Sequence, residues 1–186
     1  IAYALNGVVF YSGAVGNKLL DPPCPQLDIY DGTAEWISFD CCSGHSSGDG
    51  GYHYHFPPSC LIAQAEAEAP IAGGHSPQVG WAADGFPVYG PRGEHGTLMK
   101  ACGSTIAGPC LAACGGYYGP SSQDDYVYRY HTTGEAHEAN TEAQRAAPNT
   151  YGSEFYPFTP ACLAGCVPDE LITSSCPDCA SSGYVQ

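Results

Sequence analysis

Apolar and polar residues alternate over short stretches of this chain, and turn-forming residues separate the stretches. Glycine occurs 24 times and proline 16 times in 186 residues, so few stretches are longer than one strand. Short apolar runs bounded by glycine, proline, asparagine or aspartate are typical of β-strands. The pattern predicts strands in four ranges, NGVVFYSG at 6–13, LDIYDG at 27–32, VGWAADGFPVYGP at 79–91 and DDYVYRYHTT at 124–133.

Two other segments are rich in alanine, glutamate and glutamine, which favour helix. They are CLIAQAEAEAP at 60–70 and TGEAHEANTEAQRAAP at 133–148. The second has few large apolar residues, so it fits either a solvated surface helix or a long loop. We therefore expect a single, mostly β domain with little helix.

The strictest alternation is the tetrapeptide YHYH at 52–55. Successive side chains of a strand point to opposite faces, so the two tyrosines should share one face and the two histidines the other. We interpret four tyrosines as cross-strand core aromatics, Tyr52, Tyr54, Tyr128 and Tyr130. A glycan-stacking platform is the alternative interpretation of these rings.

A weak internal repeat relates two parts of the chain. In each, Cys-x-Gly precedes a polar turn, then Tyr-x-Tyr-His, then a cysteine flanked by proline. Residues 52–55 thereby align with residues 128–131, which predicts a duplicated β-hairpin unit. If the repeat holds, the same disulfide should close each hairpin, Cys42 with Cys60 and Cys114 with Cys162.

Composition narrows the class of protein. Eleven cysteines with no zinc-ribbon spacing indicate a disulfide framework formed in an oxidising compartment, so we expect a secreted, extracellular protein. The formal net charge of −14 argues against nucleic-acid partners and anionic membranes. No apolar run approaches the ~20 residues of a membrane span, and no nucleotide-binding fingerprint is present.

The strongest candidate for chemistry is a group of histidines. His53 and His55, at i and i+2 on one strand, would project from one face about 6–7 Å apart. His45 could supply a third imidazole from the preceding turn, and His131 or Asp84 a fourth ligand. Imidazole with carboxylate or water suits Cu(II) or Zn(II). The alternative is that these imidazoles only hydrogen-bond backbone carbonyls in a glycine-rich corner.

The remaining candidates have simpler interpretations. Asp84, in Asp-Gly, is expected either to cap a turn or to orient a histidine. Asp40 and Asp49 are further carboxylates that could complete a metal shell. Three other histidines stand among glycine, serine and glutamate and are expected to be solvated, His75, His95 and His137.

Several motifs in order resemble one family. FDCCSGHSSGDGGYHYHFPPSC, GWAADGFPVYGPRG, YVYRYHTTGE and FYPFTPACLAGC resemble the YHYH-domain family, and LNGVVFYSG is similar to its first strand. The resemblance implies a secreted domain of unestablished activity at 1–166, followed by a cysteine-containing tail at 167–186. The chain departs from the family at Arg129, where a histidine is common, and a guanidinium there would repel a metal ion.

Two principal functions follow as expectations. The first is a non-catalytic extracellular structural or binding module, self-assembling through its N-terminal strand, IAYALNGVVF, or binding a glycan. The alternative is a copper- or zinc-dependent enzyme acting on a polymer such as polysaccharide, and a metal-sequestering protein is a third. Nucleophilic catalysis has little support, because no Gly-x-Ser-x-Gly elbow occurs and the cysteines should be oxidised.

Overall fold

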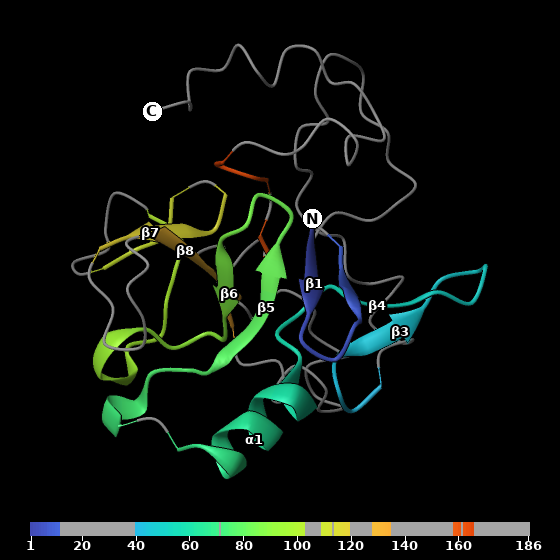
Figure 1. The fold of residues 1–186 in the computed structure, drawn as a ribbon, viewed down its shortest axis with the longest axis horizontal. Helices are drawn as coiled ribbons and strands as arrows, with labels where there is room; N and C mark the ends of the chain where they lie inside the picture. The colour runs from blue at the N-terminus through green and yellow to red at the C-terminus, as the bar shows by residue number, and fades with distance from the viewer. Residues whose placement is uncertain are drawn as a thin grey trace, which may run out of the picture.

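The computed structural model describes residues 1–11, 40–70, 72–102, 109–112, 114–119, 128–134, 158–160 and 162–165. The strand expected at 27–32, most of the segment at 133–148 and the tail at 167–186 lie outside these ranges. Within them, eight strands form one sheet (Figure 1). The predicted mostly β fold is confirmed. The elements are β1 (Ala2–Ala4), β2 (Val9–Phe10), β3 (Gly44–Ser46), β4 (Tyr52–Tyr54), α1 (Ser59–Glu68), η2 (Ala72–Gly74), β5 (Gln78–Ala82), β6 (Pro87–Tyr89), η3 (Glu94–Gly96), β7 (Gly116–Tyr118) and β8 (Tyr128–His131).

The order of strands in the sheet is β3-β4-β2-β1-β5-β6-β8-β7. The connectivity is the same from either edge, because the order is β3-β4-β2-β1 from one edge and β7-β8-β6-β5 from the other. Two antiparallel hairpins, β1–β2 and β5–β6, meet in the centre through the antiparallel pair β1–β5. On one side β4 runs parallel to β2, and on the other β8 runs parallel to β6. Each edge strand, β3 or β7, closes an antiparallel hairpin with its neighbour. That the halves derive from a duplicated unit stays a prediction.

The two central hairpins turn at Asn-Gly and Asp-Gly, the dipeptides that mark turns in the sequence. Gly7 and Gly85 have φ of 84° and 85°, in the left-handed region that glycine adopts without steric cost. The turns also share their hydrogen bonds, because each glycine N–H donates to an alanine carbonyl three residues earlier, that of Ala4 or Ala82, at 2.9 Å. Local turn chemistry therefore explains both hairpins.

The core lies where the central strands meet the tyrosines of β4 and β8. Its members are buried residues of both halves, Ala2, Ala4, Phe10, Tyr54, Val79, Ala82, Val88 and Tyr130. Small residues at the centre let strands β1 and β5 approach closely. A Cβ atom on Gly80 would lie 2.4 Å from the carbonyl oxygen of Tyr3, so glycine is required at this position.

Helix α1 begins directly after the β3–β4 hairpin and lies at one end of the sheet (Figure 1). It confirms the helix predicted at 60–70, and it ends two residues before Pro70, which cannot continue a helix. None of its residues is fully buried, but Leu61 and Ile62 pack against the core. Among the described residues, no helix combines the length and the apolar character that crossing a membrane requires.

Both predicted disulfides are present. Cys42–Cys60 brackets the β3–β4 hairpin, and Cys114–Cys162 ties the start of the β7–β8 hairpin to a segment 48 residues later. A third bond, between Cys102 and Cys110, closes a short loop that the sequence analysis did not identify. Each bond restricts the unfolded chain, and a typical disulfide thereby stabilises the folded state by about 2–4 kcal/mol.

Candidate metal centre

Three histidines of the β3–β4 hairpin converge on one point. His45 on β3 pairs directly with His53 on β4, and His55 follows the end of β4. Their ligand nitrogens all lie within 4.8 Å of one another. The ring centroids are 4.4 Å apart for His45 and His53, and 4.8 Å apart for His53 and His55. These three residues, here called the histidine triad, could hold a metal ion.

The alternation in YHYH separates two faces, as predicted. The rings of Tyr52 and Tyr54 lie side by side with centroids 5.8 Å apart, and the rings of His53 and His55 adjoin on the other face. The expectation that the tyrosines pack inward is only partly met, because Tyr54 is buried whereas Tyr52 is 37% exposed. Both histidines are buried, each 4% exposed, so the face they share is covered.

Hydrogen bonding directs the imidazole nitrogens toward each other. Nδ1 of His53 lies 2.9 Å from the carbonyl oxygen of Gly51 and donates to it, which leaves Nε2 with its lone pair. That Nε2 accepts a hydrogen bond from Nε2–H of His55 at 3.0 Å. Two nitrogens each about 2.05 Å from one ion are about 2.9 Å apart at a right angle and about 3.3 Å apart in a tetrahedron. The observed separation therefore fits a shared Cu(II) or Zn(II) ion.

Tyr11 forms one wall of the triad. Its ring stacks on His53 with centroids 4.1 Å apart and meets His55 edge-on at 5.8 Å. The backbone of Tyr11 is held on two sides, because its N–H donates to the carbonyl of Tyr54 and its carbonyl accepts from the hydroxyl of Thr159 at 2.7 Å. Tyr11 could not be recognised from the sequence as part of this site, since the parallel pairing of β2 with β4 has no local sequence signal.

The turn between β3 and β4 sets the register that brings His45 opposite His53. Gly50 has φ of 87°, and its N–H donates to the carbonyl of Ser47 at 2.9 Å. The Asp49 carboxylate accepts a hydrogen bond from the Ser47 hydroxyl, the main reason why the pKa of this exposed carboxyl lies below its usual value. Asp49 therefore stabilises the turn.

Asp40 fixes the other end of the hairpin. Its Oδ1 accepts from the N–H groups of Cys42 and Gly44 at 2.9 and 3.1 Å, and its Oδ2 accepts from the Tyr52 hydroxyl at 2.6 Å. Burial, and then this bond to a carboxylate, raises the pKa of Tyr52 above its usual range. Neither Asp40 nor Asp49 belongs to the groups of described residues whose ligand atoms could share one ion.

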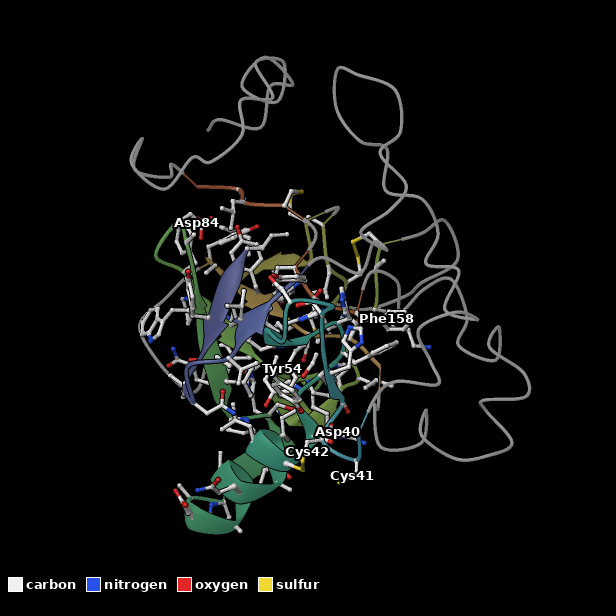
Figure 2. All side chains as sticks on the ribbon, turned by 90° about the vertical axis from the view of Figure 1, so that its right-hand side faces the viewer. Asp40, Cys41, Cys42, Tyr54, Asp84 and Phe158 are labelled. Atoms are coloured by element: carbon white, nitrogen blue, oxygen red, sulfur yellow. A yellow bond between two sulfur atoms is a disulfide. The ribbon has the colours of Figure 1, made fainter. Side chains whose placement is uncertain are left out.

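Asp84 lies in the turn of the β5–β6 hairpin, apart from the triad. Figure 2 shows it at the opposite end of the sheet from Asp40 and Cys42. Its Oδ2 accepts hydrogen bonds from the Tyr130 hydroxyl at 2.6 Å and from the N–H of Gly165 at 2.9 Å. Burial, and then the bond to this carboxylate, raises the pKa of Tyr130. Asp84 was expected either to cap its turn or to lie beside the histidines. Its carboxylate instead joins β8 to the segment at 162–165.

His131, the other suggested fourth ligand, also lies elsewhere. It stands on β8, and four strands separate β8 from β4 in the sheet (Figure 1). Adjacent strands are about 4.8 Å apart, so the two positions are separated by roughly 24 Å. The motif alignment pairs His131 at the end of β8 with His55 after β4, and these two strands lie in different parts of the sheet.

The second half of the sheet lacks the triad among its described residues. Arg129 on β8 takes the place of His53, and Tyr117 pairs with it on β7 in the place of His45. The Arg129 guanidinium lies 5.0 Å from the Tyr117 ring centroid, and its Nη2 lies 4.0 Å from the carboxylate of Glu94. A guanidinium carries no lone pair for a metal. In this half the buried Arg129 side chain therefore occupies the position that His53, a candidate ligand, occupies in the first half.

His75 corrects a further expectation. It was expected to be solvated, but it is 2% exposed, and its ring centroid lies 5.1 Å from that of Tyr89 and 5.5 Å from that of His131. Its Nδ1 donates to the carbonyl of Ser76 at 2.6 Å. Its loop-like sequence gives no sign of this burial, which depends on the packing of β6 and β8 over it. His95 is exposed as expected, and His137 lies outside the described residues.

Comparison with known proteins identifies one family. A family model described as YHYH protein matches residues 1–110, which is more than half of the chain. The matched residues include the histidine triad, the Cys42–Cys60 disulfide and both central hairpins, and they end before β7. Comparisons with curated proteins and with solved structures gave no match.

Proposed function

The chain belongs to the YHYH protein family, and we propose that it is an extracellular binding module that holds one Zn(II) or Cu(II) ion through His45, His53 and His55. The observation that supports this most strongly is the convergence of three imidazoles whose ligand nitrogens lie within 4.8 Å of one another. The Nε2 atoms of His53 and His55 share a hydrogen bond at 3.0 Å, and a metal ion in place of its proton would accept both lone pairs at once.

The burial of two of the three histidines favours a structural role for the ion. His53 and His55 are each 4% exposed, and the Tyr11 ring lies directly against them. A polymer such as polysaccharide would have little access to an ion held there. The ion would instead connect β3 to β4 and thereby stabilise the hairpin that the Cys42–Cys60 bond also brackets.

One observation favours the enzymatic alternative. The triad offers three protein ligands, which is also the number in catalytic zinc sites, where water takes the fourth position. An ion with an exchangeable water binds small anions. If azide changes the visible spectrum of the Cu(II)-loaded protein, a fourth position is open, and a small substrate becomes plausible while a polymer does not.

Self-association stays a proposal of the same kind. The expected route, in which the N-terminal strand pairs with a neighbouring subunit, is not supported, because β1 already pairs with β2 and β5 of its own sheet. The edges of the described sheet are β3 and β7. An assembly would therefore have to use these edges or surfaces away from β1.

We also propose a secreted location, which the disulfides support. Three disulfides within the described residues are consistent with folding in an oxidising compartment.

Metal analysis of the purified protein tests the proposal. After loading with zinc or copper and dialysis, the wild-type protein should retain one ion per chain. The double variant His53→Gln, His55→Gln and the single variant His45→Gln should retain none, because the first loses two ligands and the second loses one from a site of three. His95→Asn is the matched control, since His95 is an exposed histidine whose φ of 58° asparagine tolerates.

Circular dichroism should first show that every variant is folded. An ion retained by the double variant, or no ion retained by the wild-type protein, would contradict the proposal.

A further inference from the structure

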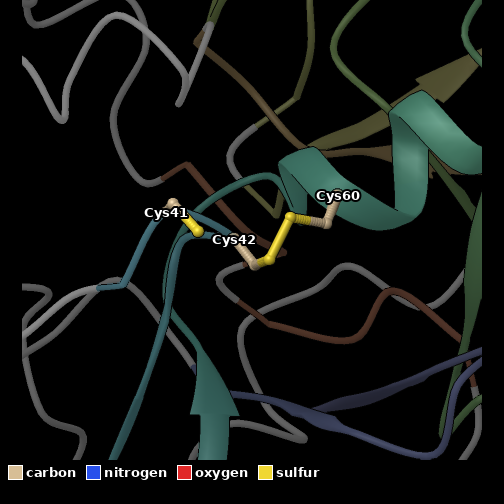
Figure 3. Close-up of side chains that lie close together, drawn as sticks. All are labelled: Cys41, Cys42 and Cys60. Carbon is tan, nitrogen blue, oxygen red and sulfur yellow. A yellow bond between two sulfur atoms is a disulfide. The ribbon is translucent and has the colours of Figure 1, made fainter.

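Three sulfur atoms gather at the start of helix α1. The Sγ atoms of Cys41, Cys42 and Cys60 all lie within 4.8 Å of one another (Figure 3). Cys42 and Cys60 form a disulfide, whereas Cys41 is a free, exposed thiol. A free thiol thus lies close enough to a disulfide to reach it by rotation of its side chain. This cluster is distinct from the histidine triad.

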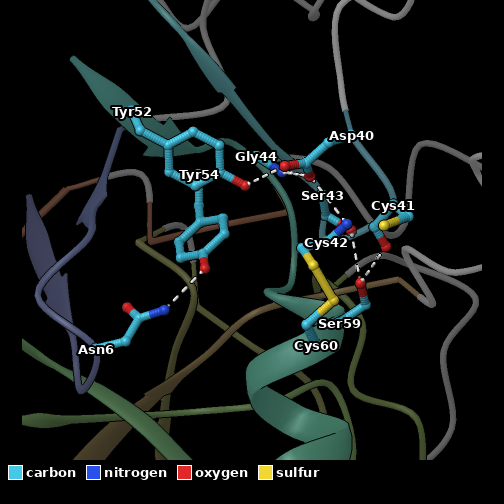
Figure 4. The surroundings of a disulfide bond; sticks show 10 residues. All are labelled: Asn6, Asp40, Cys41, Cys42, Ser43, Gly44, Tyr52, Tyr54, Ser59 and Cys60. Atoms are coloured by element: carbon cyan, nitrogen blue, oxygen red, sulfur yellow. Dashed lines mark hydrogen bonds between the residues drawn. A yellow bond between two sulfur atoms is a disulfide. The ribbon is translucent and has the colours of Figure 1, made fainter. Parts of the chain in front are cut away.

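The backbone around Cys41 is held beside the helix. The Ser59 hydroxyl donates to the carbonyl of Cys41 at 3.1 Å, which ties this residue to the first residue of α1 (Figure 4). The hydroxyls of Ser43 and Ser59 lie 3.2 Å apart, and Asp40 accepts from the N–H of Cys42. These bonds hold the Cys41 thiol next to the disulfide in the folded protein.

We propose that Cys41 is a resident nucleophile for thiol–disulfide exchange with the Cys42–Cys60 bond. The Cys41 thiol loses its proton, and its sulfur attacks Sγ of Cys60. The Cys41–Cys60 bond forms as the Cys42–Cys60 bond breaks, and the departing Cys42 thiolate takes up a proton. One disulfide and one thiol are present before and after, so no oxidant or reductant is consumed.

Disulfide geometry decides which sulfur is attacked. Attack on Cys42 would join adjacent residues, whose Cα atoms are about 3.8 Å apart across a trans peptide, below the usual disulfide range of about 4.4–6.8 Å. Attack on Cys60 meets no such limit, because the existing bond already spans Cα atoms 4.9 Å apart, and Cys41 is one residue from Cys42. The product is therefore a Cys41–Cys60 disulfide with Cys42 as the free thiol.

The helix favours this reaction. Cys60 is the second residue of α1, and the first turn of this 10-residue helix contains no acidic residue. The N–H groups at a helix N-terminus stabilise negative charge on a nearby sulfur, and exchange distributes one negative charge over three sulfurs. Cys60 is also exposed, so its sulfur is accessible.

The exchange preserves the closure of the hairpin that carries the histidines. In both isomers a disulfide joins the residues before β3 to the start of α1, so the loop length changes by one residue only. Loss of Cys42 should consequently be tolerated, because Cys41 can replace it. The Cys102–Cys110 bond is the matched control, since no free thiol adjoins it among the described residues.

Mapping of free thiols tests the proposal. Wild-type protein is held at mildly alkaline pH without denaturant and alkylated with a maleimide. It is then digested under non-reducing conditions, and fragment-ion spectra distinguish Cys41 from Cys42. The expected result is alkylation at both residues, in different molecules, with Cys60 always bonded. Alkylation at Cys41 alone overturns the proposal.

Two variants extend the test. Cys42→Ser should contain a Cys41–Cys60 disulfide and no alkylation at either residue, whereas Cys102→Ser should leave Cys110 alkylated. A Cys42→Ser protein with both Cys41 and Cys60 alkylated overturns the proposal as well. If that variant does not fold, the wild-type measurement still decides, because it requires no substitution.

Discussion

The buried imidazole of His131 should make the stability of this protein depend on pH. His131 is fully enclosed in the sheet, and its Nδ1 donates to the carbonyl of Gly90 at 2.8 Å. Burial is the main reason why its pKa falls to about 3, and the hydrogen bond to Gly90 offsets part of this effect. Of the charged groups around it, His75 and Arg129 lower the pKa further, and Glu94 raises it.

The size of the effect follows from the difference between folded and unfolded states. In the unfolded chain a histidine has a pKa of about 6.5. Between about pH 6.5 and the folded value the unfolded state binds a proton that the folded state does not, so stability is full above this window and falls as the pH is lowered into it. At pH 5.5 the free energy of unfolding is lower by RT ln(1 + 10), about 1.4 kcal/mol. This value holds for any folded-state pKa that lies well below 5.5.

Urea unfolding of wild-type protein and of His131→Asn measures this contribution. Asparagine cannot titrate, and its amide can donate to Gly90 in place of Nδ1. Other groups also titrate, so the informative quantity is the change in unfolding free energy from about pH 8 to about pH 5.5, compared between the two proteins with a chelator present.

The variant should be less stable at both pH values, but its loss on acidification should be smaller by about 1.4 kcal/mol. Equal losses in the two proteins would refute the reasoning, because His131 would then bind protons equally in the folded and unfolded states.

Two further predictions concern packing and hydrogen bonding. Gly80→Ala should destabilise the fold by about 1–3 kcal/mol, since its Cβ would lie 2.4 Å from the carbonyl oxygen of Tyr3, whereas Gly48→Ala, with no atom nearby, should have little effect in the same thermal unfolding assay. Tyr130→Phe should lower the free energy of unfolding by about 1–3 kcal/mol, because the Tyr130 hydroxyl donates to the carboxylate of Asp84 and accepts from a backbone N–H. Tyr54→Phe should lower it by about 0.5–1.5 kcal/mol, because the Tyr54 hydroxyl accepts from one side-chain amide. Equal costs within either pair would contradict these assignments.

The parts of the fold that depend on neighbouring residues could be predicted from the sequence. Asp84-Gly85 was recognised as a turn, because glycine adopts its positive φ without steric cost. The prediction of one N-terminal strand, IAYALNGVVF, was wrong, because the chain turns at Asn6-Gly7 between β1 and β2. The alternation in the tetrapeptide at 52–55 gave the two faces of β4. The recurrence of Cys-x-Gly before Tyr-x-Tyr-His predicted two disulfides, Cys42–Cys60 and Cys114–Cys162, and both are present.

The features that depend on pairing between strands far apart in the sequence could not be predicted. The parallel pairs β2–β4 and β6–β8 join segments without a shared turn, so Tyr11 was not recognised as a wall of the triad. For the same reason His131 and Asp84 were assigned to the triad although the sheet holds them apart from it. His75 has the sequence context of an exposed loop, and only the packing of Tyr89 and His131 around it makes it buried.

X-ray absorption spectroscopy of the metal-loaded protein tests the central claim most directly, because the chain has two described groups of side chains that could hold an ion and they differ in donor element. One group offers three imidazole nitrogens, and the other offers the Cys41 thiol, with the sulfurs of Cys42 and Cys60 available only where their disulfide is reduced. The histidine triad predicts three imidazoles with nitrogen at about 2.0–2.1 Å from the metal and no sulfur. Sulfur at about 2.3 Å, or fewer than three imidazoles, would contradict the proposed site.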